Sequence, residues 1–303
     1  MKRTKNPAKE AEYRKRAADL VAQMTLHEKV SQMLSWAPAI ERLGIPAYNW
    51  WSEGIHGVGR AGTATVFPQA IGMAAAFDEN MMEQVGNAVG VEARGKYNMC
   101  RAHGDRDIFK GLTVWAPNIN IFRDPRWGRG HETYGEDPFL TSRLGVRFVE
   151  GMQGNDPDYL QAAACAKHFA VHSGPESDRH HFNAIVSKQD LWETYLPAFR
   201  ALVKEAGVEA VMGAYNRTNG EPCCGSKTLL KDILRDKWHF DGHVTSDCWA
   251  IKDFHTGHMV TDGPVESVAL AVNNGCDLNC GDLYVYLEQA VAEGKLSEEK
   301  IDE

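Results

Sequence analysis

Apolar residues along the 303-residue chain recur with two different spacings, and the spacing changes from segment to segment. In the N-terminal part, apolar positions such as Leu20 and Met24 recur every three to four residues among many Ala, Glu, Lys and Arg residues, which predicts helix. Thr25 followed by Glu28 fits a capping box, which marks the start of a helix. We therefore expect two helices here rather than one.

Beyond this part, short runs rich in β-branched and apolar residues alternate with longer segments of helical period. The expected strands are Ala47–Trp51, Thr113–Ile121, Ala162–Phe169, Phe182–Val186, Ala210–Ala214, His243–Ser246 and Asp277–Asn279. The expected helices are Glu79–Tyr97, Pro138–Met152, Lys188–Glu205, Lys227–Lys237, Pro264–Asn274 and Asp282–Glu293. Repeated strand–helix units indicate a parallel sheet, and about seven or eight units favour a closed barrel. The predicted fold is an α/β protein with a TIM-like (β/α)8 barrel.

No repeat or low-complexity linker interrupts the chain, so we expect residues 1–303 to form one barrel domain. Ser297, followed by Glu298 and Glu299, predicts the cap and first turn of a helix that has only begun where the sequence stops. The barrel is therefore expected to be incomplete at its C-terminus. An apolar seam left there favours marginal stability or association.

Composition narrows the class of protein. Lys and Arg number 33 against 41 Asp and Glu, and the formal net charge of −8 argues against a nucleic-acid partner. No apolar run approaches the ~18 residues of a membrane-spanning helix, and the polar N-terminus lacks a signal-peptide core. We expect a cytoplasmic protein with no membrane partner, no metal and no cofactor. Seven cysteines without CxxC spacing are expected to be free, mostly buried thiols.

In a barrel, the residues that carry chemistry lie at the carboxyl ends of the strands. One expected strand ends with Lys167 and His168, and another is followed directly by Asp247. An acid at a strand end can be a nucleophile, a general base, a metal ligand or a helix cap. Adjacent cationic donors at Lys167 and His168 would suit a ligand with hydroxyl groups and would keep nearby acids ionised.

Other polar stretches are harder to interpret. The loop Arg123–Pro138 carries many charges, and we expect internal ion pairs with one or two arginines turned toward a ligand. Glu53 follows two tryptophans at another strand end. Gly57–Gly62 fits the dinucleotide pattern G-x-G-x-x-G, but the β-branched residues before Pro68 keep a helix from following directly, so we interpret it as a loop.

Several long stretches occur in a fixed order between about Leu43 and Cys280: WWSEGIHGV, TVFPQAIGMAAAFD, APNINIFRDPRWGRGHETYGEDP, ACAKHFAVHSGPESDRHHF, DLWETYLPAF, VMGAYNRTNGEP and GHVTSDCWAI. Together they resemble the N-terminal barrel domain of glycoside hydrolase family 3, in its branch of β-xylosidases and β-glucosidases. The resemblance implies a retaining exo-β-glycosidase that hydrolyses terminal β-D-xylosyl or β-D-glucosyl residues of oligosaccharides.

The resemblance also implies a role for each matching residue. Asp247 would be the nucleophile that forms a glycosyl-enzyme intermediate, with Lys167 and Arg129 holding its pKa low. The residues expected to bind the sugar are Glu53, Arg129, Lys167, His168, Tyr215 and Trp249. Glu53 stands where many glucosidases have a shorter Asp, which favours the xylosidase type without deciding between xylose and glucose.

Two departures from the family pattern matter. Cys248 follows the nucleophile where many glucosidases have Trp, and Trp249 comes one position later, so the stacking residue is open. The family's usual acid/base is a Glu on a second, α/β sandwich domain that follows the barrel, and we expect the isolated chain to lack it. That domain, or a second copy of the chain, would be its protein partner.

Two alternative functions remain at this point. One is a single-domain enzyme similar to the family's β-N-acetylglucosaminidases, in which a loop histidine is the acid/base. His180, oriented by Asp178, is the candidate for that role. The other is a carbohydrate-binding module that has kept the sugar subsite and lost turnover.

Overall fold

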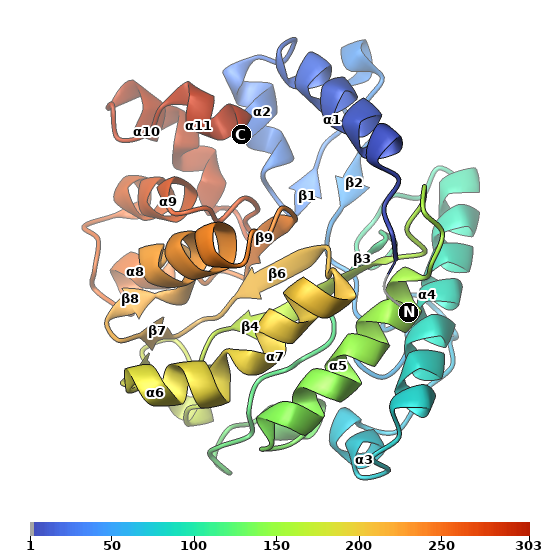
Figure 1. Ribbon diagram of the computed structural model, residues 1–303. Helices are drawn as coiled ribbons and strands as arrows, with labels where there is room; N and C mark the ends of the chain where they lie inside the picture. Colours follow the sequence, from blue (N-terminus) through green and yellow to red (C-terminus); the bar gives the residue numbers. More distant parts are fainter. Residues whose placement is uncertain (1–2) are drawn as a thin grey trace.

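The computed structural model describes residues 3–303, and its helices surround a curled sheet of parallel strands (Figure 1). Regular pairing runs in the order β3-β4-β6-β9, and every pair in this order is parallel. The strands are β3 (Thr113–Val114), β4 (Ala163–Phe169), β6 (Ala210–Gly213) and β9 (His243–Ser246). They are almost entirely buried, as expected for strands that carry helices on one face and a barrel interior on the other.

Short segments continue this sheet into a ring. Ser52 bridges to β3 and Leu278 bridges to β9, each through a single parallel bridge. A third bridge joins Asn279 to Leu34, just before β1 (Trp36–Ala37), and β1 pairs with β2 (Tyr48–Asn49), which precedes Ser52, so the two ends are linked through this pair. The predicted TIM-like barrel is therefore confirmed, with ladder pairing on one side and isolated bridges on the other.

One pair of strands departs from the strand–helix alternation. β1 (Trp36–Ala37) and β2 (Tyr48–Asn49) pair antiparallel. Residues 38–47 join them through only one short 3₁₀ turn, η1 (Glu41–Leu43). A parallel crossover needs about a dozen residues or more, so this connection is too short to carry a helix across the sheet.

The expected strand over Phe182–Val186 is wrong as a barrel strand. Part of it, β5 (Asn183–Ala184), belongs to a separate three-stranded sheet in the order β5-β7-β8. β7 (Arg217–Thr218) and β8 (Glu221–Pro222) form a hairpin that the sequence analysis missed. Its signal was present, because the turn Asn219-Gly220 has positive φ at both residues, as two-residue hairpin turns prefer.

The predicted helices are present, with α1 (Pro7–Val21) and α2 (Leu26–Gln32) at the N-terminus. Both hydrogen bonds of the capping box between Thr25 and Glu28 form, which confirms the boundary between these helices. The other α-helices are α3 (Ala70–Ala74), α4 (Glu79–Ala102), α5 (Pro138–Gln153), α6 (Lys188–Asp190), α7 (Pro197–Ala201), α8 (Asp253–Thr256), α9 (Pro264–Asn273), α10 (Leu287–Ala292) and α11 (Glu298–Asp302).

Several helical segments have tighter or wider turns than an α-helix. The 3₁₀ segments besides η1 are η2 (Gly130–Glu132), η3 (Glu176–Asp178), η6 (Cys223–Gly225) and η8 (Leu283–Tyr286). The π-type segments are η4 (Leu191–Tyr195), η5 (Leu202–Ala206) and η7 (Lys227–Lys237). The helix expected over Lys188–Glu205 is thus a chain of α6, η4, α7 and η5, interrupted where Pro197 lacks a backbone N–H.

Two glycines bring α4 and α5 into close contact. A Cβ on Gly86 would lie against the carbonyl group of Phe148, and one on Gly151 would lie against the carbonyl group of Glu83. Any larger side chain at these positions would push the two backbones apart. Because α5 also packs on β4, this helix pair fixes one flank of the barrel.

The C-terminal segment packs on the N-terminal one (Figure 1). Ser297 caps α11 by accepting the N–H of Lys300, as predicted. Lys29 of α2 pairs with Glu298 at 2.8 Å and with Asp302 at 2.6 Å. Within residues 3–303, no helix is both long and apolar enough to cross a lipid bilayer.

Candidate active site

Asp247 lies directly after β9, beside the carboxyl ends of β4 and β6, and only 7% of its surface is exposed. Its Oδ1 atom accepts the backbone N–H of Cys248 at 2.8 Å. Its Oδ2 atom is buried, and no group among the described residues donates a hydrogen bond to it. The carboxylate therefore has one oxygen fixed by the backbone and one free to react.

The ring of His168 is held between two neighbours. Arg129 Nη1 lies 2.8 Å from Nε2, and Asn120 Oδ1 lies 2.9 Å from Nδ1. A guanidinium can only donate, so Nε2 accepts and Nδ1 carries the proton. Burial above all, and then the charge of Arg129, lowers the pKa of His168 well below its usual value.

His168 is therefore neutral, and the expectation of two adjacent cationic donors is wrong for this residue. Its Nε2 atom lies 3.7 Å from Asp247 Oδ2, and this contact is not an ion pair because the imidazole is uncharged. Of Lys167 and His168, only Lys167, which precedes His168 in the chain, is a cation.

Lys167 reaches toward Glu53 across the mouth of the barrel. The Nζ atom of Lys167 lies 3.6 Å from Oε2 of Glu53, and the lysine side chain is only 4% exposed. Trp51 donates its Nε1–H to the other oxygen of Glu53 at 2.7 Å. The two residues come from different strand ends, and the structure brings them together.

Arg129 is anchored by its own loop. Its Nε donates to both carboxylate oxygens of Glu132, at 3.0 and 3.1 Å. Burial opposes ionisation of Glu132, yet the Arg129 guanidinium lowers the pKa of this carboxyl below its usual value. Arg126 pairs in the same loop with Asp124 at 2.7 Å. The expected internal ion pairs are therefore present, and Arg129 is an arginine of this loop that turns inward, to His168.

The pKa of Asp247 differs from the expectation. Burial raises the pKa above its usual value, while Arg129, the Cys248 N–H, Lys167 and Arg179 oppose the rise without cancelling it. The prediction that cations hold this pKa low is therefore wrong, because desolvation is the largest effect. The carboxylate is a poorly solvated base, as a nucleophile in a closed site should be.

Tyr215 and Trp249 occupy different positions around the mouth. Tyr215 follows β6 and is 8% exposed, and burial together with the charge of Asp247 raises the pKa of its hydroxyl. Trp249 is 51% exposed and adopts a positive φ of 62°, which is rare for a bulky residue. Its ring thus faces solvent at the rim, where it is available for stacking.

His180 is oriented by a carboxylate other than the expected one. Its Nδ1 atom lies 2.8 Å from Oδ2 of Asp253, so Asp253 rather than Asp178 is its partner. The His180 ring also meets the Tyr215 ring edge-on, with centroids 4.8 Å apart. Asp253 could not be found from sequence spacing, because 73 residues separate it from His180.

A disulfide joins Cys248, next to the nucleophile, to Cys280. The expectation that all seven cysteines are free is wrong for this pair, because folding brings together two residues 32 positions apart. The other five are free, and Cys165, Cys223, Cys224 and Cys276 are buried as predicted.

Three further residues act at the site without having been assigned a role. Asn120 and Glu132 fix His168 and Arg129, and both lie within motifs that carried the resemblance. Arg179 lies 5.6 Å over the Tyr215 ring, pairs with Glu176 and contributes positive charge at Asp247. Spacing could not reveal the contact of Asn120 with His168, because the two are 48 positions apart, whereas the pairs Arg129–Glu132 and Glu176–Arg179 are each three residues apart.

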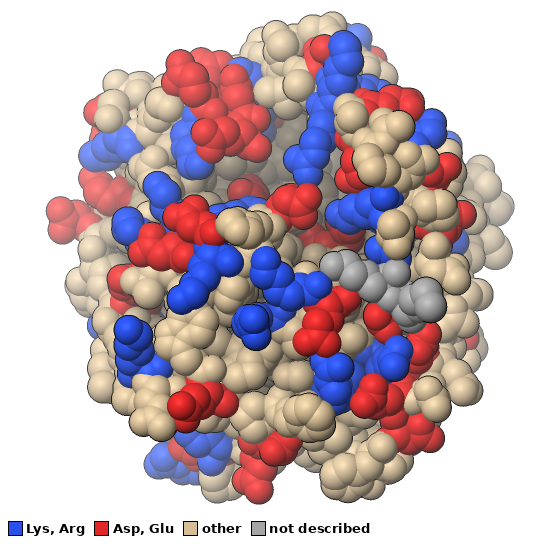
Figure 2. Space-filling view, in the orientation of Figure 1, with Lys and Arg blue, Asp and Glu red and all other residues tan. Residues whose placement is uncertain are grey.

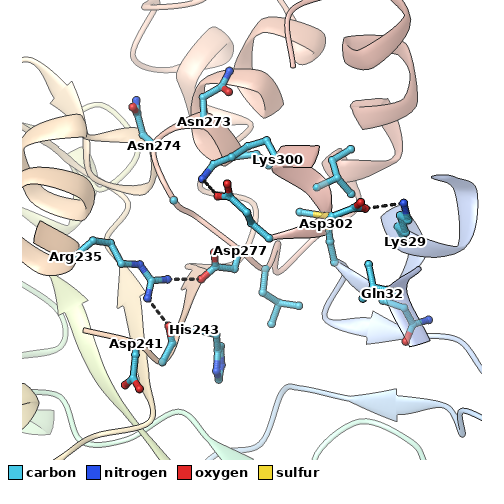
Figure 3. Close-up of a pocket in the computed structure, with 18 of the residues that line it drawn as sticks. Lys29, Gln32, Arg235, Asp241, His243, Asn273, Asn274, Asp277, Lys300 and Asp302 are labelled. Atoms are coloured by element: carbon cyan, nitrogen blue, oxygen red, sulfur yellow. Dashed lines mark hydrogen bonds and ion pairs between the residues drawn. The ribbon is translucent and has the colours of Figure 1, made fainter. Parts of the chain in front are cut away.

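A cavity of about 730 Å³ opens elsewhere, at the amino ends of the strands. Its lining includes His243, the first residue of β9, and Arg235 pairs with Asp277 there at 2.7 Å (Figure 3). Figure 2 shows acidic and basic side chains interspersed on a hollowed face of the molecule. In barrels this end serves stability, so the candidate site is the mouth around Asp247.

Comparison with known proteins agrees with this geometry. Residues 16–303 match the model of the Glycosyl hydrolase family 3 N terminal domain. Xylan 1,4-beta-xylosidase of Xylanibacter ruminicola is 50% identical over 95% of this chain and 34% of its own length. Probable beta-D-xylosidase 7 of Arabidopsis thaliana is 44% identical over 95% of this chain and 39% of its own length.

Solved structures agree as well. The GH3 exo-beta-xylosidase XlnD, in complex with a xylobiose aziridine activity-based probe, has a TM-score of 0.89 and 35% identity over 95% of this chain and 38% of that protein. A beta-glucosidase from Listeria innocua in complex with isofagomine has a TM-score of 0.80 and 28% identity over 95% of this chain and 44% of that protein.

The chain spans between a third and two-fifths of the length of these curated relatives. Within that span the match is continuous, and it includes every strand end that contributes to the Asp247 site. Because the family model covers far more than half of the sequence, the chain belongs to glycosyl hydrolase family 3, as its N-terminal domain.

Proposed function

We propose that this domain is the nucleophile-bearing half of a retaining exo-β-glycosidase that removes terminal β-D-xylosyl residues. The observation that carries the proposal is the state of Asp247. One carboxylate oxygen is fixed by a backbone N–H, and the other is buried and unpartnered among the described residues at a mouth lined with cations. Such an oxygen is suited to attack an electrophilic carbon held in the mouth.

In the proposed reaction, Asp247 Oδ2 attacks the anomeric carbon of the terminal sugar. A carbon–oxygen bond forms to the carboxylate, and the bond to the leaving oxygen breaks with its electron pair, which a general acid protonates. Water then attacks the same carbon, giving a proton back to the group that acted as acid, and the bond to Asp247 breaks and restores the carboxylate. Positive charge from Arg129, Lys167 and Arg179 opposes the rise in the pKa of Asp247 that burial causes, and so favours its ionised form.

The sugar hydroxyls would meet donors and an acceptor that are already oriented. Lys167 and Arg129 donate, and Glu53 accepts through an oxygen that faces Lys167 at 3.6 Å. These side chains are fixed by Trp51, Glu132 and each other before any ligand binds. Donors that need no rearrangement stabilise an oxocarbenium-like transition state most effectively.

Xylose is the favoured sugar for two reasons. Glu53 is held across the mouth by Trp51 and Lys167, where its length leaves less space for the hydroxymethyl group of a hexose than an aspartate would. Curated relatives that are 44–50% identical to this chain also carry xylosidase names.

We place the general acid outside the described residues. Two carboxylates beside the mouth are already engaged, Glu53 with Lys167 and Asp253 with His180. The relatives are much longer than this chain, and the acid/base would come from the part of them that this chain does not match.

The experiment tests the role of the nucleophile with a substrate that does not need a general acid. A 2,4-dinitrophenyl 2-deoxy-2-fluoro-β-xyloside carries a leaving group that departs without protonation, and its fluorine slows hydrolysis of the intermediate. Intact-mass spectrometry is expected to show one covalent sugar per chain, and peptide mapping is expected to place it on Asp247.

Asp247→Asn, which removes only the nucleophilic charge, is the matched control and should remain unlabelled. The corresponding glucoside should label the wild type more slowly. A folded chain that gains no adduct, or gains it on another residue, would refute the proposed nucleophile.

A further inference from the structure

The nucleophile lies at a seam of the barrel where regular strand pairing ends. On one side, β9 pairs with β6 along all four of its residues. On the other side, only Thr245 forms a bridge, to Leu278, and regular pairing ends. Asp247 follows immediately, so the segment that carries it is held by a regular strand ladder only on the side of β6.

A compact set of bonds compensates at this seam. Ser246 donates its N–H to the carbonyl of Leu278 at 2.8 Å, and its hydroxyl accepts the N–H of Cys280 at 3.0 Å. Trp249 donates its N–H to the carbonyl of Cys280 at 2.6 Å. The disulfide between Cys248 and Cys280 lies in the middle of these hydrogen bonds.

Cys248 has a second connection, to the nucleophile itself. Its N–H fixes Oδ1 of Asp247 at 2.8 Å, so the direction of this N–H sets the rotation of the carboxylate and thereby the aim of Oδ2. We propose that Cys248 and Cys280 are positioning residues, whose disulfide holds the Cys248 N–H in place and so orients Asp247 for attack. This inference rests on the proposed role of Asp247.

The disulfide is shielded from reduction. Cys248 is 7% exposed and Cys280 is 1% exposed, so a thiol reductant has little access to either sulfur. The free thiol of Cys165 packs in the same apolar cluster. Burial raises the pKa of Cys165, which keeps this thiol protonated and unable to attack the disulfide.

Titration of thiols in denaturant tests the link directly. Five reactive thiols are expected without reductant and seven with it, given seven cysteines and five free ones. Seven thiols without reductant would overturn the proposal at this first step.

The positioning role is tested by Cys248→Ala/Cys280→Ala with the 2-fluoroxyloside probe. Displacing a reacting group by about 1 Å costs roughly 100-fold in rate, so we expect the rate constant of labelling to fall about 10- to 100-fold. The probe's inhibition constant should change less than about threefold, because Glu53, Arg129 and Lys167, which would hold the sugar hydroxyls, come from other strand ends, and only Trp249 adjoins the disulfide. Cys100→Ser, on the outer helix α4, is the matched control and should label at the wild-type rate.

Hydrogen–deuterium exchange gives a readout that does not need the probe. The amides of Cys248 and Trp249 should exchange at least about tenfold faster in the double variant, while those of β6 stay unchanged. If the variant does not fold, wild type reduced with a phosphine is measured instead.

The outcomes separate the two proposals. An unlabelled wild type refutes Asp247 as nucleophile, and the exchange measurement then decides the role of the disulfide. Unchanged exchange at residues 246–249, or a labelling rate constant within about threefold of the wild-type value, would overturn the positioning role.

Discussion

The residues around Asp247 divide into charged groups and neutral supports. Arg129 and Lys167 carry charge into the mouth, whereas His168 and Asn120 form a neutral, fully hydrogen-bonded pair beneath them. A second cation at His168 would have repelled Arg129 at 2.8 Å. Lys167 and His168 are therefore neighbours in sequence with different roles: Lys167 brings charge to the mouth, and His168 is a neutral support for Arg129.

Glu53→Asp is expected to shift the preference of the mouth toward glucose. Shortening the side chain by one methylene withdraws the carboxylate from the region in which a hexose hydroxymethyl group would lie. One methylene in a binding pocket changes discrimination by roughly 10–200-fold, so the xyloside-to-glucoside ratio of labelling rates should fall by about tenfold or more. An unchanged ratio would assign the discrimination to other residues.

Asp247→Asn is expected to stabilise the fold at neutral pH. Burial raises the pKa of Asp247, so the ionised carboxylate costs stability above that pKa, and the cost disappears as the pH falls through it. Removing the charge should raise the free energy of unfolding by on the order of 1 kcal/mol at pH 7. Urea unfolding at pH 7 and at pH 4 should show the gain narrowing in acid; a gain that grows in acid would contradict the stated cause.

At the scale of elements, the contact between α4 and α5 gives a matched pair of glycine substitutions. Gly86→Ala places a Cβ against the backbone of Phe148 and should destabilise the fold by about 1–3 kcal/mol. Gly95→Ala, in the same helix, meets no atom within 4 Å and should stabilise it by about 0.5–1 kcal/mol. Thermal unfolding of both variants measures this, and equal effects would contradict the packing argument.

The barrel strands could be predicted from sequence because each is a short run rich in apolar or β-branched residues between segments of helical period. The predicted range of β9 matches the structure, and the predicted range of β4 differs from it by one residue. The mouth could not be predicted in the same way. Its contacts, such as His180 with Asp253 and Cys248 with Cys280, join loops far apart in the chain, and local periodicity carries no signal about which loops meet. The motifs therefore identified the site residues while leaving their partners open.

At the scale of the whole molecule, buried histidines should set the response to acid. Burial lowers the pKa of His172 to about 3 and those of His243 and His258 to about 4. In the unfolded chain each titrates near its usual value, so the unfolded state binds more protons below about pH 6.5. The stability present above pH 6.5 should fall as the pH drops toward 4, by up to ~1.4 kcal/mol per pH unit for each histidine.

His243→Phe isolates one of these histidines. It should reduce the slope of unfolding free energy against pH by about one proton between pH 6 and 4.5. Equal slopes for His243→Phe and the wild type would contradict a buried, neutral His243.

Both ends of the described part of the chain, residues 3–303, lie away from the mouth. Arg3 and Lys5 pair with Glu209, which precedes β6, and Glu303 lines the same cavity as Glu209 and the first residue of β9. Both ends therefore emerge at the amino ends of the strands, opposite Asp247. A bead or surface coupled through either end would leave the sugar-binding mouth facing the solution, so immobilisation should not block the entry of a long oligosaccharide.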